Sequence, residues 1–180
     1  EMAQCDWSSD VCSSDLPPIP GIELAIPGWD TFFVDPHTIG QRVVVVGGGL
    51  VGSEASLEWA AHGRQVTVVE ARERLVPDSL GIHRTALLDQ MTAHGVTSVL
   101  ETTVLRIQPD GVLVRDSEGE RLLPADSVIV GLGQRPRNAE AQALADAAGD
   151  VPVFVIGDAV AARRVGEAVT QAYRAAMSIT

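Results

Sequence analysis

The sequence has few aromatic residues and almost no cysteine. Aromatic side chains make up 4% of its 180 residues, and its two cysteines, Cys5 and Cys12, both fall near the start. Two cysteines without a nearby histidine do not make a metal site. From residue 17 onward there is no cysteine at all, which excludes a redox-active C-x-x-C pair and iron–sulfur ligation from that part of the chain.

Long apolar runs and an excess of basic charge are missing too. No apolar run approaches the roughly 18 residues of a membrane-spanning helix, and no basic-then-apolar leader precedes the rest. The net charge of −11 argues against nucleic acid or an anionic membrane surface as a partner. Hydrophobic residues, at 46%, suffice for a core in one large domain or one and a half small ones. We expect a soluble, cytoplasmic protein.

The first sixteen residues differ in character from the rest. Residues 6–16 (DWSSDVCSSDL) resemble one reading frame of a common sequencing adapter. We therefore interpret residues 1–16 as a disordered artefact of sequence assembly and leave them out of the fold prediction. The alternative is a genuine polar and disordered N-terminus.

The central feature of the sequence is the stretch at 42–70. Four consecutive valines at 43–46 predict a strand buried on both faces of a parallel sheet. A turn that fits the pattern G-x-G-x-x-G follows at once, and a helix to about position 62 begins there. The turn consists of Gly47, Gly48, Gly49, Leu50, Val51 and Gly52. A second β-branched run at 66–69 ends at Glu70, which completes a βαβ unit.

The spacing of these residues has a physical reason. Gly47 allows a tight turn, Gly49 lets a diphosphate approach the backbone because it has no Cβ, and Gly52 allows close packing of helix and strand. The helix start offers unpaired N–H groups and a partial positive charge to the phosphates. Glu70 follows Gly47 by 23 positions, near the roughly 20 typical of an acid that holds the adenosine ribose. We predict dinucleotide binding; the alternative is a βαβ unit whose glycines serve packing alone.

The following segments predict a Rossmann-like α/β domain over residues 41–136. A helix at 80–93 and a short strand around 96–99 come first. Asp-Gly and Glu-Gly turns then separate three β-branched runs, which predicts an antiparallel β-meander at 103–108, 112–115 and 120–123. A buried strand at 126–130 returns to the parallel-sheet pattern.

The two flanking segments are less regular. Residues 17–40 are rich in proline and glycine, which predicts an extended linker with turns. We expect its aromatic residues to cover a hydrophobic edge, with ligand stacking as the alternative; they are Trp29, Phe32 and Phe33. Beyond 136 we expect an alanine-rich helix, a short strand at 153–156 and a final helix from about Val165. We expect the sequence to stop inside that helix, as if cut at both ends.

No residue in the sequence indicates acid–base catalysis. His83 and His94 fall on or just after the predicted helix at 80–93, where a histidine on a solvated face usually has no catalytic role. No catalytic His, Tyr or Ser-Tyr-Lys set stands where a substrate could meet a nicotinamide. We therefore assign no catalytic residue and disfavour an ordinary single-domain dehydrogenase.

Four motifs, in this order, resemble the pyridine nucleotide-disulfide oxidoreductase superfamily, whose members have two dinucleotide-binding domains. The motifs are GGGLVGSEA, VTVVEARERL, VIVGLGQRPRN and FVIGDA. The resemblance covers nearly everything from residue 17 to residue 180. It implies an NAD(P)H domain at 41–136, a part of an FAD domain at 137–180 and a linker or FAD-domain remnant at 17–40, with NADH and FAD as cofactors.

The resemblance also assigns single residues. The segment similar to the end of the NAD(P)H domain supplies Gly131, Leu132 and Gly133. By the same likeness Asp158 of the Gly157-Asp158 pair would bond a flavin ribityl hydroxyl, although such a pair also serves as a strand-ending turn. Glu54 resembles the acid near the nicotinamide carboxamide, and on the residues alone it equally fits an acid that complements the helix dipole.

The coenzyme choice depends on Glu70 and its neighbours. A carboxylate repels a 2′-phosphate, so Glu70 favours NADH over NADPH. Arg72 and Arg74 keep NADPH open, since arginine can accept that phosphate. Ala71, between them and Glu70, is included in the predicted cofactor site.

Within the superfamily, GDAVAARRVGEAVTQAYRAA is most similar to the old yellow enzyme-related, 2,4-dienoyl-CoA reductase-like branch, with Arg163 and Arg164 after the Gly-Asp pair. That branch implies an N-terminal FMN barrel with an iron–sulfur cluster in the same polypeptide, where activated C=C bonds are reduced. This chain has neither barrel nor cluster cysteines nor a first FAD glycine motif, so we expect it to be inactive alone. The alternatives are a non-catalytic dinucleotide-binding module and a different two-domain flavoprotein reductase.

Overall fold

The computed structural model describes residues 18–79, 81–133, 136, 138–149, 151–161, 163 and 165–179. The segment assigned to an assembly artefact, with both cysteines, lies outside the described residues. So do the predicted positions Pro17, Leu80, Gln134, Arg135, Arg137, Arg164 and Thr180. The chain divides into two compact units, Leu16–Gly133 and a second that holds the described residues from 136 onward.

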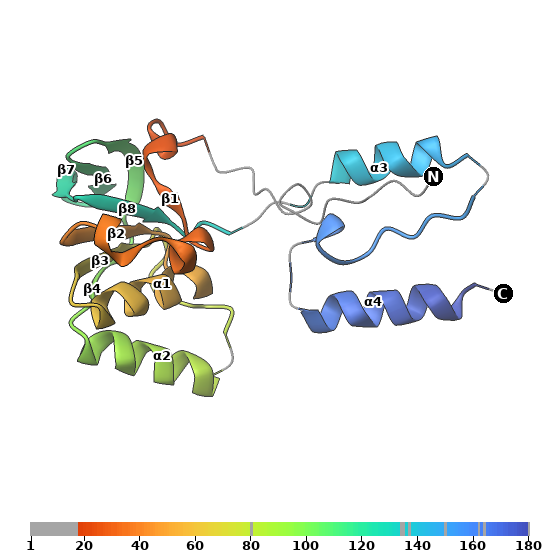
Figure 1. The fold of residues 1–180 in the computed structure, drawn as a ribbon, viewed down its shortest axis with the longest axis horizontal. Coiled ribbons are helices and arrows are strands. Elements are labelled where there is room, and N and C mark those ends of the chain that lie inside the picture. Colours follow the sequence, from red (N-terminus) through yellow and green to blue (C-terminus); the bar gives the residue numbers. More distant parts are fainter. Residues whose placement is uncertain are drawn as a thin grey trace. The chain divides into compact units, whose positions relative to one another are not determined.

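A parallel five-stranded sheet forms the centre of the first unit (Figure 1). The strands occur in the spatial order β1-β8-β2-β3-β4, and each neighbouring pair is parallel. The strands are β1 (Ile26–Pro27), β2 (Arg42–Val46), β3 (Gln65–Val69), β4 (Thr97–Val99) and β8 (Ser127–Val130). Because the chain moves from β2 to β3 on one side and returns to β8 on the other, the strand order reverses beside β2.

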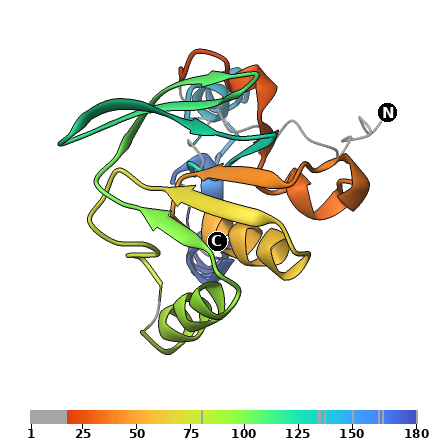
Figure 2. The same ribbon diagram turned by 90° about the vertical axis from the view of Figure 1, so that its left-hand side faces the viewer.

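Different layers cover the two faces of this sheet, as Figure 2 shows. One face carries the helices α1 (Leu50–Ala61) and α2 (Gly81–Ala93), and the other carries the antiparallel meander β5 (Thr103–Gln108), β6 (Gly111–Asp116) and β7 (Gly119–Pro124). Alternate valines of β2 serve the two layers: Val43 and Val45 join the helix-side core, and Val44 and Val46 join the meander-side core. Burial on both faces explains the unbroken apolar run, and the predicted α/β fold is confirmed.

The segment predicted as a linker contributes to this sheet. Ile26–Pro27 forms the edge strand β1, which pairs with β8, and an edge is where proline is tolerated. The indole Nε1–H of Trp59 on α1 donates to Thr31 Oγ1 at 2.5 Å, which anchors the 3₁₀ turn Asp30–Phe33. The prediction that Phe33 covers a hydrophobic edge is wrong, because its side chain is 90% exposed. A two-residue strand is too short for sequence periodicity to reveal.

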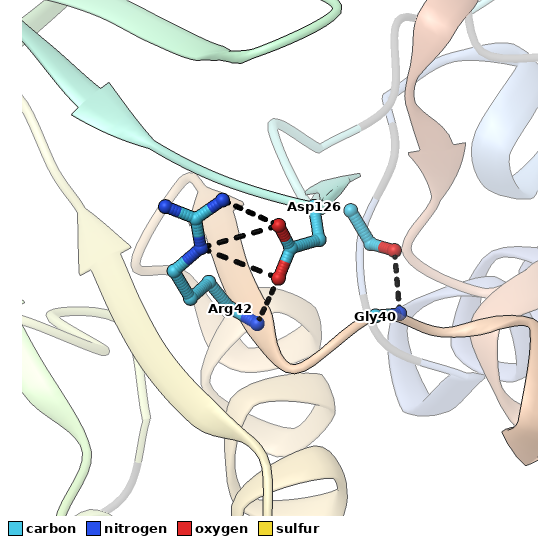
Figure 3. A network of polar contacts seen from close by, with 4 residues as sticks. Gly40, Arg42 and Asp126 are labelled. Carbon is cyan, nitrogen blue, oxygen red and sulfur yellow. Dashed lines mark hydrogen bonds and ion pairs between the residues drawn. The ribbon is translucent and has the colours of Figure 1, made fainter.

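The amino ends of β2 and β8 are joined by a reciprocal pair of residues (Figure 3). The Arg42 N–H donates to Asp126 Oδ2 at 2.8 Å, and the Asp126 N–H donates to the Arg42 carbonyl at 2.8 Å. The Arg42 guanidinium donates to Asp126 Oδ1 at 2.5 Å. These hydrogen bonds from Arg42 lower the pKa of the Asp126 carboxyl from 3.8 to about 2. Next to them, the Gly40 N–H donates to Ser127 Oγ at 3.0 Å. These contacts at the amino ends of β2 and β8 fix the register of the two strands without using residues at their carboxyl ends.

The second unit consists of α3 (Asn138–Ala147), a 3₁₀ turn at Gly157–Ala159 and α4 (Val165–Met177). The strand predicted at 153–156 is wrong: these residues pair with no strand of the described chain, and their side chains are 37–45% exposed. A strand needs a hydrogen-bonded neighbour, and none is provided there. The final helix ends at Met177, so the expectation that the sequence stops inside it is wrong. Among the described residues, no helix has the length and apolar character to span a bilayer.

Candidate dinucleotide-binding site

Three parallel strands end together at the predicted glycine turn. The Gly47 N–H donates to the Val69 carbonyl of β3 at 2.8 Å, and the Gly131 N–H donates to the Val46 carbonyl of β2 at 2.8 Å. The carboxyl ends of β2, β3 and β8 therefore meet where the strand order reverses. Beyond them lies an open cleft of about 300 Å³. Ligands of open α/β sheets bind at this kind of position.

Three glycines pack the turn, α1 and β8 against one another. Gly47 has a φ angle of +100°, which glycine adopts without strain. A Cβ on Gly52 would lie 1.9 Å from the Gly47 carbonyl oxygen, and a Cβ on Gly131 would lie 2.7 Å from the Gly52 Cα. The tight turn and the close helix packing predicted for Gly47 and Gly52 are therefore present. Gly131 is a packing glycine that the local motif did not reveal, because its contact partner lies 79 positions earlier in the sequence.

Gly49 differs from these three because it faces open space. A Cβ built on it would meet no atom closer than the Gly131 carbonyl oxygen at 4.0 Å. Gly49 is also the N-cap of α1, with no side-chain cap, and its carbonyl accepts the Ser53 N–H at 3.0 Å. The first N–H groups of a helix have no acceptor within the helix, and they concentrate the positive end of its dipole. The Gly49 end of α1 can thus receive an anion in close backbone contact.

Glu70 is held beside the turn by two backbone hydrogen bonds. Its Oε2 accepts the Gly48 N–H at 2.7 Å, and its Oε1 accepts the Arg72 N–H at 2.9 Å. Each carboxylate oxygen can accept a second hydrogen bond, so the group can still bind a sugar hydroxyl. Glu70 is partly buried and lines the cleft. The structure therefore brings the acid and the glycines together, as their spacing in the sequence predicted.

The other predicted residues of the first unit are placed as follows. The cleft is also lined by Leu50, Val51, Arg72, Leu132 and Gly133. Ala71 lines an adjoining cleft of about 360 Å³, which shares Gly47, Glu70 and Leu132 with the first. Glu54 lies on α1 and lines neither cleft, and Arg74 lines a separate cavity beside α2. Arg74 is thereby separated from the Glu70 cleft, whereas Arg72 reaches Asp78 with an Nη1–Oδ2 distance of 3.4 Å.

Sequence reasoning missed three residues around the turn: Ser53, Val76 and Asp78. The buried Ser53 hydroxyl donates to the Gly48 carbonyl at 3.3 Å, and the Val76 N–H donates to the same oxygen at 2.7 Å. Asp78 lines the cleft next to Arg72. A serine within the pattern SEAS could have suggested a buried hydroxyl. Nothing in the sequence could have indicated the backbone conformation of Val76.

The flavin-site candidates belong to the second unit. Gly157 has a φ angle of +66°, and its N–H donates to Gln171 Oε1 of α4 at 2.7 Å. Asp158 Oδ1 accepts the Arg163 N–H at 3.3 Å. These contacts tie the Gly-Asp turn to the residues around it and leave further acceptor capacity on the Asp158 carboxylate. His83 and His94 are exposed on α2 and just after it, and the described residues contain no group of three or more His, Cys, Asp or Glu placed to hold a metal.

The sequence match to known families agrees with this geometry. Residues 13–177 match the family described as pyridine nucleotide-disulphide oxidoreductase. This chain belongs to that family. The superfamily predicted from the four motifs is confirmed, although the match begins inside the segment assigned to an assembly artefact.

Two curated relatives of this chain are reductases of longer chain length. A metal reductase of Desulforamulus reducens is 32% identical over 89% of this chain, and a bilirubin reductase of Mediterraneibacter gnavus is 34% identical over 89%. The chain covers 28% and 25% of those two proteins. It thus spans about a quarter of the length of these relatives.

Solved structures show the same fold. A 2-naphthoyl-CoA reductase in complex with 2-naphthoyl-CoA is 25% identical, with a TM-score of 0.80 over 93% of this chain and 26% of the other. An FAD-dependent pyridine nucleotide-disulphide oxidoreductase from Desulfovibrio vulgaris is 27% identical, with a TM-score of 0.57 over 80% of this chain and 38% of the other.

Proposed function

We propose that the chain is the NADH-binding part of an FAD-dependent oxidoreductase. The observation that carries the proposal is the cleft at the ends of β2, β3 and β8. There the exposed N-terminus of α1 begins at the open Gly49, and the Glu70 carboxylate is held beside it at 2.7 Å from the Gly48 nitrogen. A diphosphate fits against the helix start and a ribose hydroxyl fits against Glu70.

The charges around Glu70 support NADH rather than NADPH. A 2′-phosphate would meet the Glu70 carboxylate directly. Arg72, the cation nearest to it in the cleft, already has the Asp78 carboxylate 3.4 Å away. Two carboxylates and one arginine do not make a phosphate site, because the net local charge is negative. The protein's own residues would hold the sugar and the diphosphate, and the hydride chemistry would be supplied by the nicotinamide and the flavin when bound.

The second unit supports a flavin partner and further domains of the same polypeptide. Asp158 would hold a flavin ribityl hydroxyl, by its likeness to the family motif. The apolar residues of α4 recur on one stripe and are exposed by 61–79%; they are Val165, Val169, Tyr173 and Met177. A stripe of this kind fits a face that packs against the rest of an FAD domain. By the resemblance to the old yellow enzyme-related branch, further domains of the polypeptide would carry the FMN and iron–sulfur centres and the substrate site for an activated C=C bond. We propose a cytoplasmic location for the whole protein.

The purified 180-residue chain tests the proposal. Calorimetric titration should show saturable NADH binding, with weaker binding of NADPH, and the isolated chain should retain little FAD. It should not reduce an enone with NADH, because the proposed substrate site lies in further domains of the polypeptide. Absence of saturable NADH binding would contradict the cofactor assignment. Enone turnover by this chain alone would contradict the assignment of the substrate site elsewhere.

A further inference from the structure

Val76 has a backbone conformation that β-branched residues rarely adopt. Its φ angle is +49°, in the left-handed region, and among the described residues Glu101 is the only other non-glycine residue with a positive φ. This conformation is unfavourable for valine and persists only where the surroundings impose it. The side chain of Val76 is 1% exposed within the helix-side core. Burial therefore holds the strained backbone in place.

The strained backbone directs the Val76 N–H at the glycine turn. That N–H donates to the Gly48 carbonyl at 2.7 Å, and the Ser53 hydroxyl donates to the same oxygen at 3.3 Å. On the other side of Gly48, its N–H donates to Glu70 Oε2 at 2.7 Å. Both peptide groups of Gly48 are thus held by the protein itself.

The orientation of the Gly48 carbonyl also fixes the Gly49 N–H. The two groups belong to one trans peptide, in which they point in opposite directions. Because the Gly48 oxygen points toward Val76, the Gly49 N–H points away from Val76, and Gly49 lines the cleft. If Val76 relaxed to a negative φ, its N–H would turn away and the peptide could rotate. The carbonyl oxygen could then face an incoming anion and repel it.

We propose that Val76 is a positioning residue for the dinucleotide. It acts through its backbone, by holding the Gly48–Gly49 peptide so that the Gly49 N–H is presented before the ligand arrives. Such preorganisation raises affinity because the free protein does not have to be reordered on binding. The proposal rests on the proposed function of the cleft, and it explains why a strained valine occurs in the loop that follows Glu70.

Two substitutions at position 76 separate positioning from packing. Val76→Ala removes the buried methyl groups that impose the left-handed backbone, whereas Val76→Gly adopts that backbone without strain. Loss of one hydrogen bond at the site should weaken NADH binding by about fivefold to tenfold in Val76→Ala. Val76→Gly should remain within about twofold of the wild type. The matched control is Val114→Ala, which deletes the same methyl groups from a fully buried position in the meander and should leave NADH affinity unchanged.

The order of NADH affinities of the Val76→Ala and Val76→Gly variants distinguishes a positioning role from a packing role. A packing role predicts that glycine is worse than alanine, so weaker NADH binding by Val76→Gly than by Val76→Ala would overturn the proposal, as would equal affinity in all variants. If the wild type itself does not bind NADH, the proposed function fails instead. If the variants do not fold, amide hydrogen exchange in the wild type tests the proposal instead. The Val76 amide should be protected from exchange like the amides of β2, and fast exchange would overturn the proposal.

Discussion

Three glycines around the cleft pack closely against backbone, whereas Gly49 at the start of α1 faces open space. Gly47, Gly52 and Gly131 each lie within 3 Å of backbone when a Cβ is added, while Gly49 does not. The first group therefore matters for folding and Gly49 for the ligand. This division gives substitutions that separate stability from affinity.

Gly49→Ala should abolish tight contact with the diphosphate and leave folding intact. The φ of −69° and ψ of −173° suit alanine, so the variant should fold with a stability within about 1 kcal/mol of the wild type, because the gain from a less flexible unfolded chain is offset by the poorer N-cap. Its methyl group occupies the space where the phosphate approaches, so NADH affinity should fall by roughly tenfold or more. Calorimetric titration and thermal unfolding measure the two effects.

Two further glycine substitutions serve as controls for Gly49→Ala. Gly81→Ala, in open space on α2, should change neither affinity nor fold. Gly52→Ala should unfold the domain, because its methyl group would lie 1.9 Å from the Gly47 oxygen. Unchanged NADH affinity in Gly49→Ala would mean that the ligand does not approach this turn.

Glu70→Gln should reduce the ratio of NADH affinity to NADPH affinity. The amide has one acceptor oxygen, so it cannot accept both the Gly48 and the Arg72 N–H while it also binds a ribose hydroxyl. NADH affinity should fall by roughly tenfold and NADPH affinity should fall less. Glu73→Gln makes the same charge change at an exposed acid and is the matched control. Equal effects of the two substitutions would show that only net charge matters.

Among the elements, the β2–β8 pair should carry an acid-sensitive contribution to stability. The Asp126 pKa is lowered from 3.8 to about 2 by Arg42. The ion pair is therefore fully present above about pH 4 and is lost as the pH falls toward 2. Asp126→Asn should lower the melting temperature at pH 7, and its difference from the wild type should shrink between pH 4 and pH 2. Glu120→Gln, which removes the exposed pair with Arg115, should have a smaller effect at pH 7. A constant difference down to pH 2 would contradict this account.

Periodicity predicted the long elements and missed those defined by contacts. The valines of β2 and β3 and the Asp-Gly and Glu-Gly turns predicted strands within one or two residues of those observed, because each pattern is local. Ile26–Pro27 was missed as a strand, since pairing with β8 depends on residues a hundred positions away. The reverse error occurred at 153–156, where an apolar run has no partner strand among the described residues.

In the candidate dinucleotide site, too, the residues set by local spacing could be predicted and those set by tertiary contacts could not. Gly47, Gly49, Gly52 and Glu70 follow from spacing alone, because one βαβ unit places them all. The placement of Arg74 in another cavity and of Glu54 outside both clefts depends on loop and helix orientation. The hydrogen bond from the Val76 N–H to the Gly48 carbonyl depends on the positive φ of Val76, which cannot be predicted from the residue type.

For the whole molecule, the two units differ in how much core they contain. Both hydrophobic clusters lie within Leu16–Gly133, and neither α3 nor α4 has a buried residue. A chain ending at Gly133 should therefore unfold cooperatively at nearly the melting temperature of the full chain and bind NADH equally well. Circular dichroism and titration check this. Loss of folding or of NADH affinity on truncation would show that residues after 133 stabilise the first unit.

The most direct measurement of the central claim is an NMR titration of the ¹⁵N-labelled chain with NADH. Amides of Gly49, Leu50 and Val51 should shift and saturate together with those of residues 70–72 and 131–133. The amide signals of the turn glycines Gly111 and Gly119 in the meander should not shift. Saturating shifts centred on the meander or on the second unit, with the residues after Gly47 unmoved, would contradict the assignment of this cleft as the dinucleotide site.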